Sequence, residues 1–227
     1  MEADMQRNKE SGGRAAMRFD ERFDAMPWDA VDAVVFDIGR VLIHFTPDTY
    51  VKALFPGDEA KQRIMMEAVY NSPYWPELDR GTKTHAEAAR LAQRDFGGSY
   101  DDYMLAMTGW CDLVVLMEEG WRVVRKCREH AKRIYLLSNY NEDCFARLTE
   151  RFADRFGVFD GRCISYEAQQ MKPEPEIYRR LLETYGLCPH RTLFIDDVPL
   201  NVQGAIGEGI NGFCMDTAGK MDAFFVD

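Results

Sequence analysis

The second half of the chain alternates between short apolar runs and amphipathic stretches. Apolar runs at 134–139, 162–166 and 192–196 contain β-branched and aromatic residues, which indicates buried strands. Between them, apolar residues recur every three or four positions, which indicates helices. The predicted helices cover 118–133, 141–152, 173–186 and 199–209. This alternation predicts an α/β fold with a parallel sheet covered by helices on both faces.

Residues 47 to about 115 show a different pattern, with no convincing strand run. The stretches EAKQRIMMEAVY, THAEAARLAQRDF and SYDDYMLAMTGW are each typical of a helix, and Thr84 and Glu87 have the spacing of a capping box. The pattern predicts a helical cap inserted after the first strand. The expected organisation is a polar N-terminal extension over 1–29, a core over 30–46 and 116–227, and a cap over 47–115.

Polar residues stand where the predicted strands end. The run VVFDIGRVLIHF, residues 34–45, starts as a buried strand and is interrupted by a carboxylate, Asp37. In an open α/β sheet, ligands bind at the carboxyl ends of the strands. The ends of the other predicted strands, and the loop after 162–166, carry further polar groups: Ser138, Asn139, Lys172, Asp196 and Asp197. If the strands are neighbours, these groups converge on one crevice.

Such a set of side chains suits phosphoryl transfer. Asp37 and one of the later carboxylates can bind Mg²⁺, which prefers oxygen ligands. Lys172 neutralises phosphoryl oxygens and Ser138 donates a hydrogen bond to them. Asp37 can then attack phosphorus and form an aspartyl-phosphate.

The order of these residues resembles the haloacid dehalogenase-like superfamily over residues 34 to about 214. The stretches YLLSNYN, MKPEPEIY and FIDDVPLNVQGA are similar to the branch of bacterial sugar-1-phosphate phosphatases and the N-terminal domain of soluble epoxide hydrolases. The resemblance implies a Rossmann-like core with a helical cap, and Asp37 as nucleophile. It also implies Mg²⁺ on Asp37, the Gly39 carbonyl and Asp197, with Asp196 close by. Phosphate would be bound by Ser138, Asn139 and Lys172, and Asn201 stands where some members carry a further acid.

Gly39 departs from the commonest pattern of that family. Most of its phosphatases carry a second aspartate there, which protonates the leaving group and then activates water. Gly39 offers only its backbone, so the acid/base role is unassigned. His44 is a candidate substitute, because an imidazole titrates near neutrality. Arg40 stands where a small residue is usual, and it either pairs with the core surface or faces the substrate.

Composition narrows the classes of partner. The net charge of −10 disfavours a nucleic-acid or anionic-membrane surface. No apolar run approaches the roughly 20 residues of a membrane span, and the N-terminus has no apolar signal-peptide centre. The six cysteines are scattered, which predicts reduced thiols in a cytoplasmic protein and no zinc site. The pattern around His85 predicts that this residue lies on the surface. The sequence does not determine the oligomeric state.

Together these features predict a Mg²⁺-dependent phosphomonoesterase acting on a small phosphorylated metabolite, with sugar phosphates among the candidates. Two alternatives stay open. One is a dehalogenase-type hydrolase of carbon–halogen bonds, which needs no metal and leaves Asp196 and Asp197 unexplained. The other is a non-catalytic phosphate-binding or interaction module that lacks a proton donor at Gly39.

Overall fold

The computed structural model describes residues 28–215 and 221–224, and its centre is a six-stranded sheet in the order β5-β4-β1-β6-β7-β8. The first five strands pair in parallel, and β8 pairs antiparallel with β7. The strands are β1 (Ala33–Phe36), β4 (Arg133–Ser138), β5 (Gly161–Ile164), β6 (Thr192–Asp196), β7 (Asn211–Met215) and β8 (Met221–Phe224). The predicted parallel sheet is confirmed. Residues 1–27 of the expected N-terminal extension lie outside the described residues.

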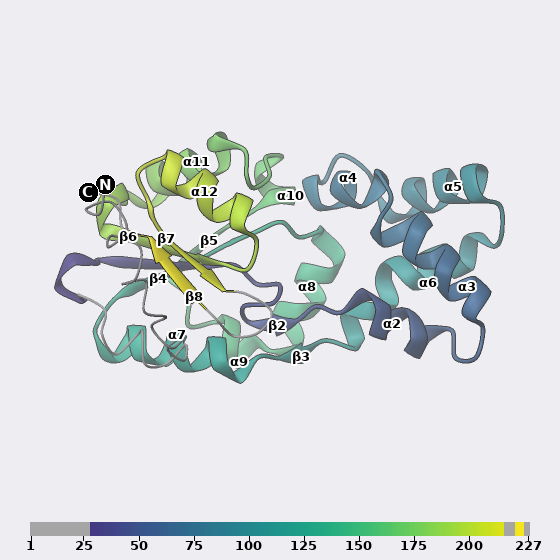
Figure 1. Ribbon diagram of the computed structural model, residues 1–227, viewed down its shortest axis with the longest axis horizontal. Helices are drawn as coiled ribbons and strands as arrows, with labels where there is room; N and C mark the ends of the chain where they lie inside the picture. The colour runs from purple at the N-terminus through teal and green to yellow at the C-terminus, as the bar shows by residue number, and fades with distance from the viewer. Residues whose placement is uncertain (1–27, 216–220, 225–227) are drawn as a thin grey trace, which may run out of the picture.

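Helices cover both faces of the sheet because β1 is apolar on both faces. Val34 and Phe36 belong to the apolar cluster under one layer of helices, and Ala33 and Val35 belong to the cluster under the other. Figure 1 shows these two layers above and below the sheet. One layer holds α7 (Glu118–Glu129), α8 (Glu142–Arg151) and α9 (Ala153–Phe156), and the other holds α10 (Ser165–Ala168), α11 (Pro175–Tyr185) and α12 (Pro199–Gly207).

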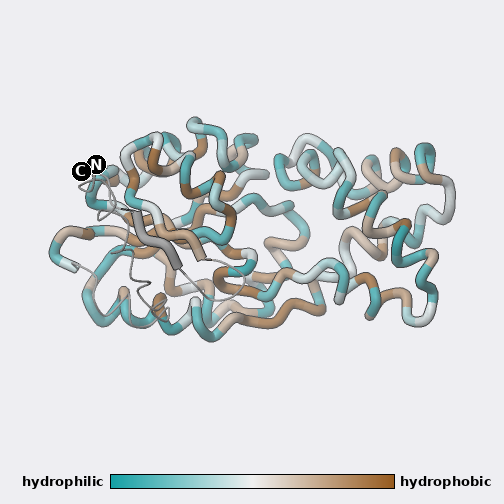
Figure 2. Tube along the Cα trace, in the orientation of Figure 1, coloured by the Kyte–Doolittle hydropathy of each residue, from teal (hydrophilic) through white to brown (hydrophobic). Residues whose placement is uncertain are grey.

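A second group of helices, which we call the cap, lies beyond the carboxyl ends of the strands (Figure 1). It has its own apolar cluster, and Figure 2 shows apolar stretches along these helices as well as along the sheet. Its helices are α2 (Pro47–Leu54), α3 (Glu59–Met65), α4 (Tyr74–Arg80), α5 (His85–Phe96) and α6 (Tyr100–Thr108), with single turns η2 (Met66–Tyr70) and η3 (Gly109–Asp112). The Thr84–Glu87 capping box at the start of α5 is confirmed. A short ladder of β2 (Ile43–His44) and β3 (Val115–Leu116) joins the two connections between cap and core.

Two sequence-based expectations are wrong at the border between cap and core. Cys111 in η3 and Cys144 in α8 form a disulfide with a Cα–Cα distance of 5.4 Å, so the six cysteines are not all reduced thiols. His85 is buried, and its Nδ1 lies 2.8 Å from the Asp143 carboxylate. Both pairs join segments that are far apart in sequence, and local patterns carry no information about such neighbours. Among the described helices, none has the length and apolar content that a membrane span requires.

Candidate active site

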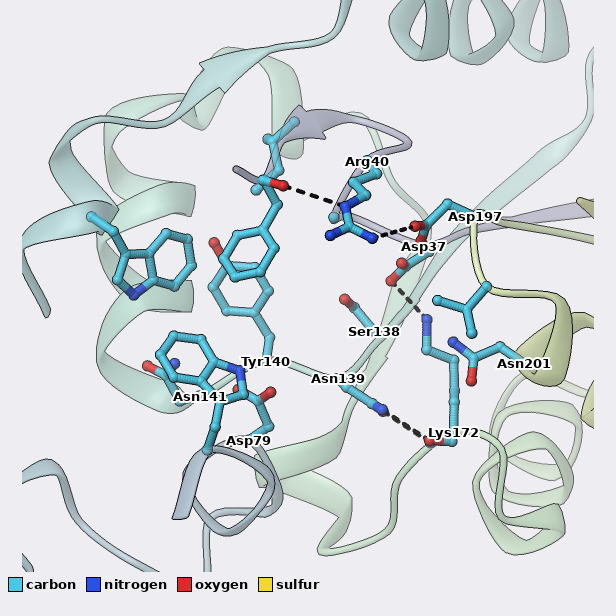
Figure 3. A pocket seen from close by; sticks show the side chains of 16 residues that line it. Asp37, Arg40, Asp79, Ser138, Asn139, Tyr140, Asn141, Lys172, Asp197 and Asn201 are labelled. Atoms are coloured by element: carbon cyan, nitrogen blue, oxygen red, sulfur yellow. Dashed lines mark hydrogen bonds and ion pairs between the residues drawn. The ribbon is translucent and has the colours of Figure 1, made fainter. Parts of the chain in front are cut away.

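A pocket of about 230 Å³ lies between the carboxyl ends of the strands and the cap (Figure 3). Because β4, β1 and β6 are adjacent in the sheet, the residues that follow them meet at one place. Eight of the ten predicted site residues line this pocket: Asp37, Gly39, Arg40, Ser138, Asn139, Lys172, Asp197 and Asn201. The two others, His44 and Asp196, are not among its lining residues.

His44 does not fit its predicted role in substrate binding. It lies in β2, where its backbone pairs with Val115, and its side chain is exposed rather than directed into the pocket. The run VLIHF therefore does not carry a second polar group into the site. None of the described residues that line the pocket is a histidine, so no imidazole stands there in place of the missing aspartate.

Lys172 is the central charge of the site. Its Nζ lies 2.7 Å from Asp37 Oδ1 and 2.6 Å from Asp196 Oδ2, and its side chain is only 1% exposed. Burial raises the pKa of Asp37 to about 7, although the Lys172 charge acts in the opposite direction. The pKa of Lys172 is raised: burial lowers it, but the two carboxylates outweigh that effect. The ammonium therefore stays charged and holds the Asp37 carboxylate in place.

Asp196 is occupied on both of its oxygens. In addition to the Lys172 ammonium, Asn201 Nδ2 donates to Oδ1 at 3.0 Å and to Oδ2 at 3.1 Å. The backbone N–H of Val198 donates to Oδ1 at 2.8 Å, at the start of α12. Asp196 therefore positions Lys172 and the N-terminus of α12, whereas the neighbouring Asp197 faces the pocket.

The carboxylates form a group that fits a divalent cation. Oxygen atoms of Asp37, Asp196 and Asp197 lie within 4.8 Å of one another. Burial raises the pKa of Asp197, and the Asp196 charge adds to that shift. Arg40 Nη1 lies 3.3 Å from Asp197 Oδ2, but the arginine side chain is 47% exposed and compensates the charge weakly. A bound cation would relieve the remaining repulsion, and hard oxygen ligands suit Mg²⁺.

Ser138 and Asn139 form the wall of the pocket next to Lys172. Ser138 is the last residue of β4 and is 1% exposed. The Asn139 side chain spans the backbone of Lys172: its Nδ2 donates to the Lys172 carbonyl and its Oδ1 accepts from the Lys172 N–H, both at 2.9 Å. Both ends of this amide are engaged, so the Asn139 side chain holds the loop that carries Lys172.

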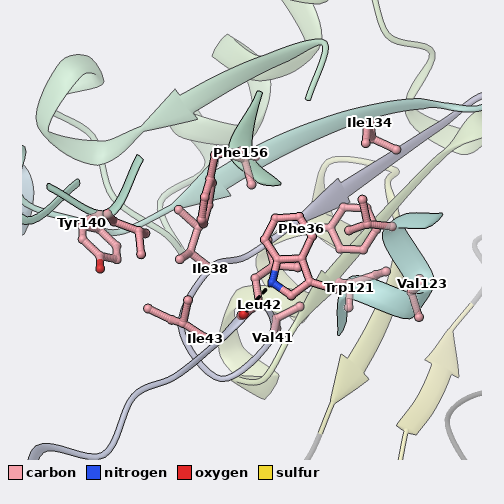
Figure 4. Close-up of a cluster of buried hydrophobic side chains, with 14 of the residues drawn as sticks. Phe36, Ile38, Val41, Leu42, Ile43, Trp121, Val123, Ile134, Tyr140 and Phe156 are labelled. Carbon is pink, nitrogen blue, oxygen red and sulfur yellow. Dashed lines mark hydrogen bonds between the residues drawn. The ribbon is translucent and has the colours of Figure 1, made fainter. Parts of the chain in front are cut away.

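The turn after Asp37 is held by apolar packing (Figure 4). Ile38, Val41, Leu42 and Ile43 are fully buried, and the N–H groups of Leu42 and Ile43 donate to the Ile38 carbonyl at 2.9 and 3.0 Å. Trp121 Nε1 donates to the Leu42 carbonyl at 3.0 Å. The second apolar run therefore folds back as a turn, which fixes Asp37 and Gly39 at the edge of the pocket.

Several lining residues were not predicted from the sequence. Tyr140 and Asn141 directly follow the predicted Ser138–Asn139 pair, so their position at a strand end was an available signal. Asp79 comes from α4 of the cap, and nothing in the local pattern marks it. The aromatic side of the pocket comes from both units: Phe45, Trp75 and Trp110.

Comparison with known proteins agrees with this architecture. Residues 31–209 match the haloacid dehalogenase-like hydrolase family. A D-ribitol-5-phosphate phosphatase of Bacteroides thetaiotaomicron is 25% identical over 177 residues, which are 74% of this chain and 84% of the relative.

Solved structures show the same fold. A haloacid dehalogenase family enzyme of B. thetaiotaomicron, solved as its magnesium complex, is 25% identical with a TM-score of 0.63, over 82% of this chain and 93% of the other. The L-2-haloacid dehalogenase of Xanthobacter autotrophicus shares the fold at 19% identity, with a TM-score of 0.57 over 80% of this chain and 76% of the other. With the family match over residues 31–209, these findings establish that the chain belongs to the haloacid dehalogenase-like hydrolase family.

Proposed function

We propose that this hydrolase is a Mg²⁺-dependent phosphomonoesterase that acts on a small phosphorylated metabolite through an aspartyl-phosphate. The observation that carries the proposal is the buried Lys172 ammonium, 2.7 Å from Asp37 in the pocket that Ser138 and Asp197 also line. The similarity to a phosphatase supports it. Sugar phosphates are among the candidate substrates.

The residues of the pocket have distinct roles in this reaction. A carboxylate oxygen of Asp37 attacks phosphorus, the ester P–O bond breaks, and the leaving alkoxide takes a proton from water. A water molecule then attacks the phosphorus of the aspartyl-phosphate, which releases inorganic phosphate and restores the Asp37 carboxylate. Lys172 and Ser138 bind the non-bridging oxygens throughout, and Lys172 also orients the nucleophile.

The metal site of the proposal consists of Asp37, the Gly39 carbonyl and Asp197, with Asn201 and Asp196 beside it. Bound there, Mg²⁺ would neutralise phosphoryl charge and let two anions approach. The pocket is small compared with the roughly 300–1,000 Å³ of typical ligand sites, which favours a small substrate.

The test is hydrolysis of p-nitrophenyl phosphate by the purified protein with Mg²⁺. We expect Asp37→Asn to abolish turnover with an unchanged melting temperature, because the amide has the same shape but cannot attack phosphorus. Asp32→Asn is the matched control, since Asp32 precedes β1 and pairs with Arg191 outside the pocket. Turnover by Asp37→Asn above a trace, or full turnover in excess chelator, would contradict the proposal. Phosphate binding without any turnover would instead identify a binding module.

We also propose that the protein has no nucleic-acid or membrane partner, from the net charge of −10, and that it is cytoplasmic, from the absence of paired cysteine spacings in the sequence. The Cys111–Cys144 disulfide argues against the cytoplasmic location, because disulfides are rare in reducing compartments. Alkylation of thiols in freshly lysed cells, followed by mass analysis, measures whether this pair is oxidised in place.

A further inference from the structure

Three polar groups lie on the side of the pocket away from Lys172: Asp79, Tyr140 and Asn141 (Figure 3). They are 8%, 5% and 2% exposed, respectively. Among the described residues, the buried Tyr140 hydroxyl has no hydrogen-bond partner, and the buried Asn141 Nδ2 has no partner of ordinary geometry other than the Asp79 carboxyl that it faces. A buried polar group without a partner costs free energy, so its presence in a pocket wall points to a ligand that completes it.

The surrounding structure fixes the positions of these groups. Asn141 Oδ1 accepts from the Cys144 N–H at 3.1 Å and caps α8, which leaves Nδ2 as the amide atom facing Asp79. Asp79 lies in the last turn of α4, and its carbonyl accepts a hydrogen bond from the Ser165 hydroxyl of the core. The cluster is therefore held by both cap and core, and it does not depend on a mobile surface side chain.

The protonation of the cluster suits a hydroxyl group. Burial raises the pKa of Tyr140 well above its ordinary value, so the phenol stays neutral and donates. Burial also raises the pKa of Asp79 to about 7, so near neutrality this carboxyl is available both as an acceptor and as a donor. Asn141 Nδ2 only donates. An alcohol hydroxyl accepts and donates at once and matches this set, whereas an ammonium only donates.

Aromatic rings complete the same side of the pocket. The ring centroids of Phe45 and Trp110 lie 5.1 Å apart, and those of Trp75 and Trp110 lie 6.0 Å apart. Such rings offer apolar surface for the C–H groups of a ligand. A leaving group that carries both hydroxyl and C–H groups can hydrogen-bond to the polar cluster and pack on the aromatic rings. A plain alkyl chain can only pack on the rings and leaves the polar cluster unpaired.

We propose that Asp79, Tyr140 and Asn141 bind hydroxyl groups of the leaving alcohol, so that the substrate is a phosphate monoester of a polyhydroxylated alcohol, a sugar or an alditol. This inference rests on the proposed phosphomonoesterase activity and names its substrate class. The three residues set specificity, while the phosphate is held by the residues around Lys172.

The experiment compares ribitol 5-phosphate with pentyl phosphate, which have the same chain length and the same primary ester. We expect kcat/KM of the wild type to favour the polyol by about 100-fold or more, because the alkyl chain leaves buried polar groups unpaired. In Asp79→Leu, Tyr140→Phe and Asn141→Asp, the ratio of the two kcat/KM values should fall about 10- to 100-fold. The Asn141→Asp variant keeps an oxygen that caps α8 but replaces the donor with a second carboxyl beside Asp79, so Tyr140→Phe is the variant that removes a donor without adding charge.

Two controls separate recognition from structural damage. Asp79→Asn keeps an acceptor oxygen and should restore part of the ratio lost in Asp79→Leu. Asp101→Leu removes an exposed cap carboxylate outside the pocket and should leave the ratio at its wild-type value. A wild-type ratio near one, or a ratio unchanged in all three variants, overturns the inference, and so does a stronger preference for 2-aminoethyl phosphate than for ribitol 5-phosphate.

Failure of the proposed activity itself is distinguishable. In that case the wild type hydrolyses neither these esters nor p-nitrophenyl phosphate, and the hydroxyl subsite is tested by measuring ligand binding instead. Calorimetry on Asp37→Asn should then show tighter binding of ribitol 5-phosphate than of pentyl phosphate. Equal affinities would overturn the proposed hydroxyl subsite.

Discussion

At the scale of the residue, the glycine two positions after Asp37 is not imposed by crowding. Within the described part of the chain, a Cβ added to Gly39 would meet only the Cβ of Phe45, at 3.9 Å. The pocket therefore has room for a side chain, and its absence has a chemical consequence. Without a carboxyl there, the leaving oxygen loses general acid help that is typically worth about 10²–10⁴-fold. In the proposed reaction water supplies that proton, so we expect esters whose alcohol departs easily as an anion, such as p-nitrophenyl phosphate, to turn over faster than primary esters such as ribitol 5-phosphate.

The buried carboxyl of Asp79 should make stability depend on pH. Its pKa rises from an ordinary 3.8 to about 7 because burial disfavours the charged form. The folded state thus holds the proton more tightly than the unfolded state. The contribution of Asp79 to the free energy of unfolding is therefore fully present below about pH 4 and is lost as pH rises through about 7.

We expect Asp79→Asn to remove the Asp79 contribution to this dependence and to leave that of Asp37, whose pKa is also raised to about 7. At pH 8 the variant should be more stable than the wild type by up to about 4 kcal/mol, and the gain should shrink toward zero near pH 4. Urea unfolding at the two pH values measures both proteins, with Asp101→Asn as an exposed control from the same cap. A gain that is equal at both pH values would show that Asp79 does not titrate in the folded protein.

At the scale of the element, α7 touches the turn that follows Asp37 so closely that one position requires glycine. A Cβ on Gly120 would overlap the Val41 carbonyl oxygen and lie 2.9 Å from its carbon. The neighbouring Trp121 donates to the Leu42 carbonyl, so the helix and the turn cannot separate without losing that bond (Figure 4).

Gly120→Ala should therefore destabilise the protein by about 3 kcal/mol and lower kcat, because the turn that carries Asp37 must move. Gly207→Ala is the matched control, because Gly207 lies in α12 and no atom of the described residues would come within 4 Å of its added Cβ. This variant should be neutral or stabilising by about 0.5–1 kcal/mol. Thermal unfolding and p-nitrophenyl phosphate turnover measure both effects. If the two alanine variants were equally stable, the approach of α7 to the Val41 carbonyl would not require glycine at position 120.

Helix α4 was missed from the sequence, and its composition explains why. Helix α4 contains Pro76 and follows Pro73, and prolines in a short polar segment are typical of turns. In contrast, α5 and α8 begin at explicit signals, the Thr84 capping box and the Asn141 N-cap, and the helices predicted there begin within one residue of the observed ones. Short helices without such signals are fixed by packing against their neighbours, which a local pattern does not record.

At the scale of the whole molecule, side-chain contacts hold the cap against the core and close the pocket. Arg80 at the end of α4 donates through both terminal nitrogens to Glu174 next to the Lys172 loop, with an Nη1–Oε2 distance of 3.0 Å. His85 pairs with Asp143, and Arg147 of α8 pairs with Asp112 of η3. The cap contributes Trp75 and Asp79 to the pocket, so its position determines the shape of the site.

Loss of the Arg80–Glu174 pair should loosen this closure. We expect Arg80→Ala to raise KM about 3- to 10-fold with a smaller change in kcat, since the phosphate end of the pocket lies in the core. Arg179→Ala is the control, because its paired carboxylate Glu208 lies on the core side and outside the pocket. Steady-state kinetics with p-nitrophenyl phosphate and with ribitol 5-phosphate measure both. The same KM change in Arg179→Ala would indicate a general loss of stability instead of a loss of cap closure.

The sequence by itself determined the parallel sheet, the insertion of a helical cap and the residues at the strand ends, because these follow from local periodicity and from the rule that parallel strands end at one edge. It correctly brought Asp37, Ser138, Lys172 and Asp197 to one pocket. Only the tertiary structure decided that Lys172 bridges Asp37 and Asp196, that His44 faces away, and that Asp79 joins Tyr140 and Asn141. These are distances between segments far apart in the chain. They are set by how the cap packs on the core, and no local pattern of residues encodes that packing.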